Sequence, residues 1–180
     1  MKRAAFLALA LFVILGGGCK SKKGGAPNLN AANQVTLRVV RLYYESPDLM
    51  LVPETRNVQL PQNPAGAVSA VARELIKGPS NPTVPRLFPA DTVVRGAFLL
   101  PDGTALVDLG GATLTQGWAT GGHEELMAVY SVVQTLTANF AEAKRVRILI
   151  NDAPAETLAG HIALDKALTP NASLVDPRVR

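Results

Sequence analysis

An apolar side chain at every second position predicts that the folded part of the chain begins with a β-strand over residues 35–44. Val35, Leu37 and Val39 mark one face of this strand, and Val40 and Leu42 make the opposite face apolar as well. We therefore expect this strand to be buried on much of both sides.

Two later segments have the three- and four-residue apolar spacing of amphipathic helices. The first begins at Asn63-Pro64, a pair suited to an N-cap and a first helical residue, and ends before Gly78-Pro79. Its apolar positions are Ala65, Val68, Val71, Ala72, Leu75 and Ile76. The second is expected over residues 123–140, with an apolar stripe of Leu126, Val129, Tyr130, Val133, Leu136 and Phe140.

Shorter patterns predict hairpins around these helices. Residues 49–52 and 56–60 are typical of a hairpin that turns at Pro53-Glu54. Residues 93–100 and 104–110 form a second, with Asp102-Gly103 in its turn. The third comprises a strand over 146–151, a turn at 152–154 and a short return over 156–158. Residues 80–89 contain three prolines and predict an irregular loop.

The predicted order of elements is therefore β-ββ-α-ββ-α-ββ. This order favours an α+β fold, in which a mixed or antiparallel sheet carries the two amphipathic helices on one face.

The first 19 residues have the pattern of an export signal. Lys2 and Arg3 precede an apolar run over 4–15, three glycines and Cys19. The apolar run is too short for a membrane helix, which needs roughly 20 residues. A small-residue run that ends in cysteine resembles the cleavage site of a bacterial lipoprotein, although Gly16 stands where that site usually has leucine. We expect Cys19 to be lipidated; the alternative is an ordinary secretory signal with an incidental cysteine.

Four regions follow from these patterns. Residues 1–18 form the signal peptide, 19–34 the lipidated cysteine and a flexible linker, 35–168 one domain, and 169–180 a polar C-terminal tail. Cys19 is the only cysteine, so the domain has no disulfide.

The basic excess of the whole chain does not belong to the domain. Lys2 and Arg3 lie in the signal, and Lys20, Lys22 and Lys23 lie in the linker, so 13 of the 18 basic residues remain against 14 acidic ones. A nucleic-acid-binding domain carries its basic excess on the fold itself, so this class of protein is excluded. The linker lysines suit an anionic membrane surface or serve only to solvate the linker.

Catalytic and metal-binding motifs are missing from the sequence. It has no Gly-x-Ser-x-Gly turn, and Ser69 and Ser131 fall within the predicted helices. A metal site would need convergence of residues that have no zinc-like spacing, namely His123, His161, Glu124, Glu125, Asp152 and Asp165. We therefore expect neither a metal nor a cofactor.

The glycine-rich segment around Trp118 is the candidate binding site. Gly121 and Gly122 lead into the second helix, where an exposed indole and a helix N-terminus suit a sugar or a carboxylate. The alternative is that Trp118 only packs its loop onto the domain. Glu124 and Glu125 are interpreted as solvated charges of the first helical turn, or else as paired acids of a glycan hydrolase.

Two histidines complete the set of candidates. We expect His123 to flank the start of the second helix. His161, which could also belong to the binding site, is expected to order the end of the chain by hydrogen bonding.

Five stretches of the sequence, in family order, resemble the GerMN domain of a spore-germination lipoprotein that carries two copies. They lie at 42–61, 67–79, 103–114, 121–137 and 146–168, so this chain has a single copy. The resemblance implies a domain without established catalytic activity that occurs on lipoproteins or beside cell-wall amidases.

From this resemblance and the signal we expect a non-enzymatic module, held by its lipid in the membrane, that binds or scaffolds an envelope protein or peptidoglycan. Lys20 is not the aspartate that retains lipoproteins at the inner membrane, which favours the periplasmic face of the outer membrane in a cell that has one. Two alternatives stay open. One is a cell-wall hydrolase or its accessory subunit, and the other is a structural lipoprotein whose sheet edges pair between copies.

Overall fold

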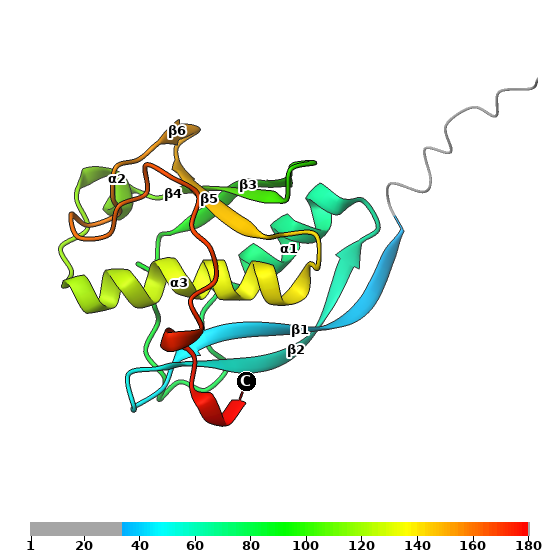
Figure 1. Ribbon diagram of the computed structural model, residues 1–180, viewed down its shortest axis with the longest axis horizontal. Helices are drawn as coiled ribbons and strands as arrows, with labels where there is room; N and C mark the ends of the chain where they lie inside the picture. Colours follow the sequence, from blue (N-terminus) through cyan, green and yellow to red (C-terminus); the bar gives the residue numbers. More distant parts are fainter. Residues whose placement is uncertain (1–33, 180) are drawn as a thin grey trace, which may run out of the picture.

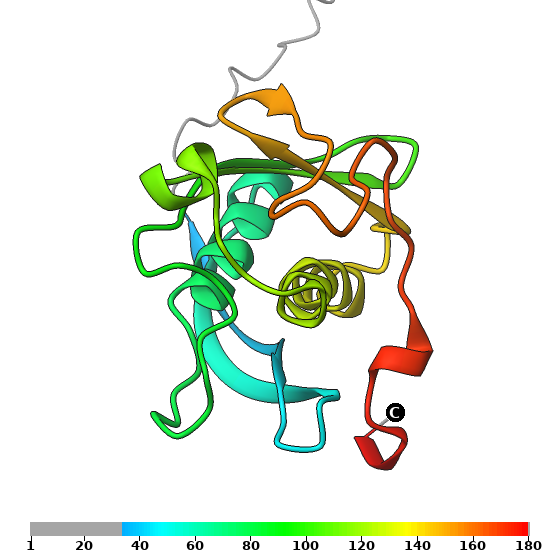
Figure 2. The same cartoon turned by 90° about the vertical axis from the view of Figure 1, so that its left-hand side faces the viewer.

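Two helices lie between two β-sheets in the computed structural model, which describes residues 34–179 (Figure 1). The helices are α1 (Pro64–Ile76) and α3 (Gly122–Asn139). One sheet pairs β1 (Val35–Glu45) with β2 (Leu51–Pro61). The other has the order β3 (Val93–Leu99), β4 (Thr104–Gly110), β5 (Arg145–Ile150) and β6 (Ala153–Pro154). Figure 2, in which α3 is seen end-on, shows this layer order.

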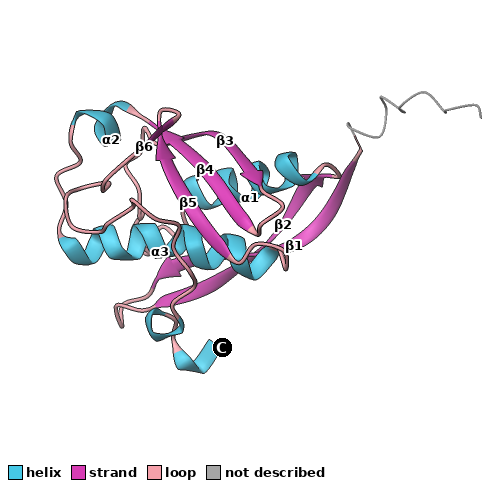
Figure 3. Ribbon diagram, turned by 45° about the horizontal axis from the view of Figure 1, so that its top comes forward, coloured by secondary structure: helices cyan, strands magenta, loops and turns pink. Residues whose placement is uncertain are grey.

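The α+β class is confirmed, and Figure 3 shows how the strands enclose the helices. In the second sheet β4 and β5 are parallel, whereas the other pairs are antiparallel. The expected placement of both helices on one face of a single sheet is wrong, because β1 and β2 form a separate sheet on their other side. As a result α3 is buried beyond its predicted stripe, and Met127, Ser131 and Thr135 are also inside. No helix within residues 34–179 is long and apolar enough to cross a membrane.

The residues that were predicted to begin and end the first helix do so in α1. Asn63 is the N-cap, and its side-chain oxygen accepts a hydrogen bond of 2.6 Å from the Gly66 N–H. Pro64 occupies the first turn, where its missing N–H leaves no bond unmade. Gly78 follows the helix with φ +92°, which favours glycine.

The predicted hairpin at 49–60 is wrong, because residues 51–61 form one strand paired along the whole of β1. The chain reverses only at the turn that Ser46-Pro47-Asp48 predicts, where the Ser46 N–H donates to the Met50 carbonyl at 2.8 Å. Pro53 is accommodated opposite Tyr43, whose own N–H points away from β2 to the Thr135 hydroxyl. The pair is therefore not hydrogen-bonded, and the strand needs no N–H at Pro53.

The expected burial of β1 on both sides holds only for its second half. Leu42, Tyr43 and Tyr44 are buried, whereas Val35, Leu37 and Val39 are exposed. The first half of the ribbon extends beyond the end of α3 (Figure 1).

The third hairpin turns earlier than predicted. Asn151 and Asp152 have φ +50° and +63° and form the turn, so the return strand β6 lies at 153–154 and not at 156–158. A short helix that the sequence did not indicate, α2 (Ala112–Gln116), follows β4.

The C-terminal segment lies against the domain as far as Val179. It contains two 3₁₀ turns, η2 (Ala172–Leu174) and η3 (Pro177–Val179). Val175 is buried and bridges to Leu51 of β2. Although it was expected to be polar, this segment therefore contributes to the core.

Three side chains satisfy the carbonyl groups at the end of α1 and thereby hold the loop that follows it. The Tyr44 hydroxyl lies 2.9 Å from the Gly78 carbonyl oxygen, and Arg56 donates to the same oxygen at 2.9 Å. Arg86, from the loop itself, donates to the Ile76 and Lys77 carbonyls. Burial raises the pKa of Tyr44 to about 12, although the Arg56 charge opposes the shift.

Candidate functional site

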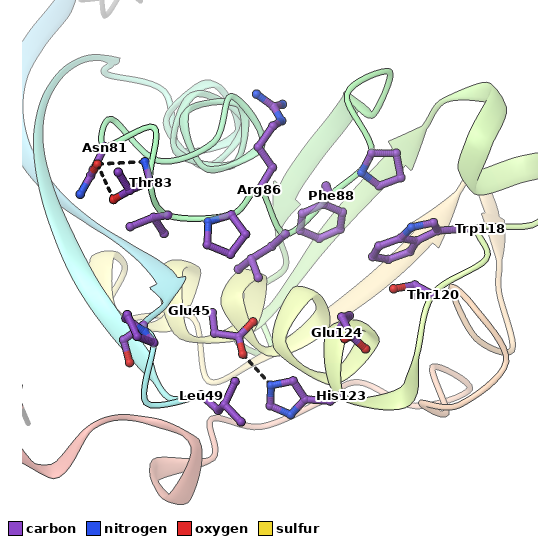
Figure 4. A pocket seen from close by; sticks show the side chains of 16 residues that line it. Glu45, Leu49, Asn81, Thr83, Arg86, Phe88, Trp118, Thr120, His123 and Glu124 are labelled. Atoms are coloured by element: carbon purple, nitrogen blue, oxygen red, sulfur yellow. Dashed lines mark hydrogen bonds and ion pairs between the residues drawn. The ribbon is translucent and has the colours of Figure 1, made fainter.

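A cleft of about 720 Å³ opens where three segments meet (Figure 4). These segments are the turn between β1 and β2, the loop 81–89, and the stretch 118–124 that leads into α3. The side chains that matter most to its chemistry are Glu45, Leu49, Phe88, Trp118, His123 and Glu124. A cleft of this volume is large enough to hold a small-molecule ligand or a short segment of a polymer.

One wall of the cleft is aromatic. The rings of Phe88 and Trp118 stack with centroids 6.3 Å apart and planes inclined by 23°. Trp118 is half-buried, packs against the core, and also borders the cleft. Trp118 therefore packs its loop onto the domain, and its indole also presents a flat apolar surface to the cleft.

The opposite wall carries a carboxylate and an imidazole. Glu45 ends β1 and His123 lies in the first turn of α3, as expected for a residue that flanks the helix start. His123 Nε2 is 2.6 Å from Glu45 Oε1. The Glu45 side chain is only 10% exposed, so its carboxyl group is largely shielded from solvent. Figure 4 shows this pair beside Leu49.

Glu124 folds back over the start of α3. Its Oε2 lies 2.5 Å from the position that a Cβ on Gly121 would occupy, so any larger residue at 121 would displace this side chain. Glu124 thereby places its charge at the positive end of the helix.

Glu125 belongs to a different cluster, and its interpretation as a solvated charge is wrong. The side chain is fully buried. Its Oε1 accepts hydrogen bonds from the N–H groups of Leu158 and Ala159 at 2.8 and 2.9 Å. Its Oε2 accepts one from the His161 N–H at 2.7 Å and lies 3.0 Å from His161 Nδ1.

This network fixes the charge of Glu125 as well as its position. Burial raises the pKa of its carboxyl, but the N–H donors of Ala159, His161 and Leu158 outweigh burial, so the pKa lies below its ordinary value. His161 therefore helps to order the segment after β6, rather than the end of the chain that it was expected to order.

The structure separates the predicted site residues into two groups. Trp118 and Glu124 border the cleft, with Gly121 beside them at the start of α3. Glu125, which is buried, and His161, whose side chain is 45% exposed, form the other group, and Gly122 lies against His161. Cys19, the signal over 1–18 and residues 19–33 of the linker fall outside the described residues.

Three further acids are paired with arginines of the second sheet. Arg95 bridges the buried Asp108 and the exposed Asp152, at 2.9 and 2.6 Å. Asp102 accepts hydrogen bonds from Thr104 and Arg145 in the β3–β4 turn. Within residues 34–179, no three His, Cys, Asp or Glu side chains gather in a way that would hold a metal ion.

Sequence reasoning missed Glu45, Leu49 and Phe88. The available signals were weak, namely an acid that ends an apolar strand and an aromatic residue in a proline-rich loop. Glu45 and Leu49 flank the β1–β2 turn, which the residues Ser46-Pro47-Asp48 indicate, but only the tertiary fold brings them together with Phe88 in one cleft.

The family model for Germane, described as sporulation and spore germination, matches residues 41–156. This match spans well over half of the chain. The domain is of the GerMN type, and the chain belongs to this family.

Solved structures show the same fold. The tandem GerMN domains of the sporulation protein GerM from Bacillus subtilis superpose with a TM-score of 0.56 at 20% identity, over 86% of this chain and 51% of theirs. This chain therefore spans about half of that pair. A predicted lipoprotein from Clostridium perfringens has a TM-score of 0.54 at 14% identity, over 80% of this chain and 95% of its own. A comparison with curated proteins gave no match.

Proposed function

We propose that this protein is an exported, lipid-anchored lipoprotein whose GerMN-type domain binds peptidoglycan glycan in the cleft, without catalysing a reaction. The observation that carries the proposal is the pairing of a stacked aromatic wall with the carboxylates of Glu45 and Glu124 across one cleft. The export signal before Cys19 supports the location.

The chemistry of the two walls suits a sugar with amide substituents. The apolar face of a sugar ring packs on a flat aromatic surface, which the half-buried Trp118 provides. Hydroxyl and amide N–H groups of the ligand would donate to the carboxylates of Glu45 and Glu124, which only accept when ionised. A few placed polar groups in an otherwise apolar cleft are typical of binding sites that fix the orientation of a ligand.

Replacing Trp118 by alanine is expected to lower the affinity of the domain for purified sacculi by about 30-fold, since an aromatic anchor contributes about 2 kcal/mol. Co-sedimentation at increasing amounts of sacculi measures this affinity. The matched control is Phe98→Ala, which removes an exposed aromatic side chain on β3 that does not line the cleft. Equal binding by the two variants would contradict a role for the cleft.

The anchor has its own test. In a host that processes lipoproteins, the unchanged chain is expected in the membrane fraction, with a diacylated Cys19 at the mature N-terminus. Cys19→Ser is expected to stay unlipidated, and mass spectrometry of the mature protein distinguishes the two. An unmodified thiol on the mature unchanged protein would rule out the anchor.

A second candidate function, a cell-wall hydrolase, is favoured by one observation. The desolvated Glu45 carboxylate contacts His123 in the same cleft that would hold the glycan. Zymography on sacculi separates the two functions. Lysis that Glu45→Gln or Glu124→Gln abolishes would establish the hydrolase, whereas binding without lysis supports the non-enzymatic module. A pull-down from envelope extract tests whether a protein, rather than a glycan, binds at the cleft.

A further inference from the structure

The first half of β1 presents a free strand edge. In a strand, the N–H and C=O groups of alternate residues face opposite edges. The Gln34 carbonyl accepts from Gln62 and the Ser46 N–H donates to Met50, so even-numbered residues face β2. The odd-numbered residues, including Val35, Leu37 and Val39, therefore face the other edge.

Helix α3 covers only part of that edge. The Asn139 side chain accepts from the Arg41 N–H at 3.0 Å and donates to the Arg41 carbonyl at 2.7 Å. The Thr135 hydroxyl accepts from the Tyr43 N–H at 3.0 Å. Because α3 ends at Asn139, this cover does not reach Val39. Within residues 34–179, the backbone groups of Val35, Leu37 and Val39 have no hydrogen-bond partner at this edge.

The uncovered edge also lacks the usual protection. Proteins protect edge strands with lysine, proline, bulges or short length. Here β1 is 11 residues long and pairs with β2 without a register shift. The side chains at the open positions are apolar, and Val35, Leu37 and Val39 are 54%, 64% and 68% exposed. A regular, apolar, open edge of this kind is a template for another strand.

We propose that a second copy of this chain occupies the edge, with the two β1 strands antiparallel about a two-fold axis at Leu37. Leu37 then lies opposite Leu37 of the second copy, and Val35 lies opposite its Val39. All three positions exchange backbone hydrogen bonds, and the two ribbons become one four-stranded sheet, β2-β1-β1-β2.

The sequence of the edge selects this register and this occupant. Apolar side chains face apolar ones at each open position, and Arg38 faces Thr36. Moving the axis by one residue toward the C-terminus would place Arg38 opposite Arg38, which is destabilising. Moving it the other way would leave Val39 opposite a residue before the start of the strand. A strand that matches itself in one register only is the pattern expected of an isologous contact between two identical subunits.

Disulfide trapping in the full chain tests the pairing. Cys19 is replaced by serine in every variant, so that the introduced thiol is the only one. In the proposed register the two Leu37 Cα atoms lie about 5.5 Å apart, which is within the range that a disulfide spans. The control is Gln59→Cys, because Gln59 is exposed and lies beside Leu37 in the β1–β2 register but on the far strand.

Under mild oxidation, Leu37→Cys is expected to form at least about tenfold more dimer than Gln59→Cys, because only position 37 meets itself within disulfide range. A mixture of Val35→Cys and Val39→Cys is expected to yield more cross-linked dimer than either variant alone. Equal cross-linking at positions 37 and 59, or none at either, would overturn the pairing. A cross-link to a different protein would overturn it in favour of an extended foreign segment. Protection of the Leu37→Cys thiol by lipid vesicles, without dimer, would overturn it in favour of the membrane surface.

Discussion

Replacing Glu125 by alanine is expected to lower the free energy of unfolding by about 3–5 kcal/mol. The substitution leaves the N–H groups of Leu158, Ala159 and His161 without their acceptor. The segment from Leu158 to His161 would lose its attachment to α3. Urea unfolding followed by circular dichroism measures the difference, with Glu124→Ala as the control because Glu124 is exposed.

The same carboxylate predicts how stability depends on pH. The pKa of Glu125 is lower in the folded state than its ordinary value of 4.5. Its contribution is therefore complete above that ordinary value and is lost as the pH falls below 4.5 through the folded-state pKa. Glu125→Gln, which keeps the shape but does not titrate, is expected to have a flatter stability profile below this pH. Identical profiles for the two proteins would show that Glu125 does not hold its charge as described.

The largest expected effect is that of Val133→Asp, which should prevent folding. Val133 is fully buried in α3, between the two sheets. An isolated carboxylate there destabilises by more than about 5 kcal/mol, which is comparable with the total stability of a domain of this size. The expected observation is loss of near-UV circular dichroism and of a cooperative thermal transition.

The matched substitution is Val93→Asp. Val93 is 52% exposed at the start of β3, so the same chemical change is expected to alter stability by no more than about 0.5 kcal/mol. Cooperative unfolding of Val133→Asp near the transition of Val93→Asp would contradict the placement of α3 between the sheets.

The parts of the fold that could be predicted from sequence depend on local chemistry. Asn63-Pro64 and Gly78 act within one helix turn, so the bounds of α1 were predicted closely. The Asp102-Gly103 turn likewise joins two strands that are neighbours in sequence.

The errors concern interactions between distant residues. Pro53 has the character of a turn residue, but in the fold it meets Tyr43 at a position that needs no N–H. The separation into two sheets depends on α3 packing against β1, which no local pattern encodes.

In the candidate site, too, the residues that are neighbours in sequence could be predicted, and those that come from distant segments could not. The glycines around Trp118 and the acids at the start of α3 are adjacent in sequence, so that part of the cleft could be predicted. Glu45 and Phe88 come to it from β1 and from the loop after α1, and only the tertiary fold brings them there. The roles of Glu124 and Glu125 could not be separated from sequence. Consecutive residues of a helix point about 100° apart, so one of the two borders the cleft and the other lies in the core.

The proposed glycan cleft is tested most directly by the fluorescence of Trp118, since this is the only tryptophan in the chain. Titration with a soluble disaccharide-peptide from peptidoglycan is expected to change the emission of the indole to saturation, and to do so much less in Glu45→Gln. An emission spectrum that stays constant up to millimolar ligand, while the same protein unfolds cooperatively, would contradict glycan binding in this cleft.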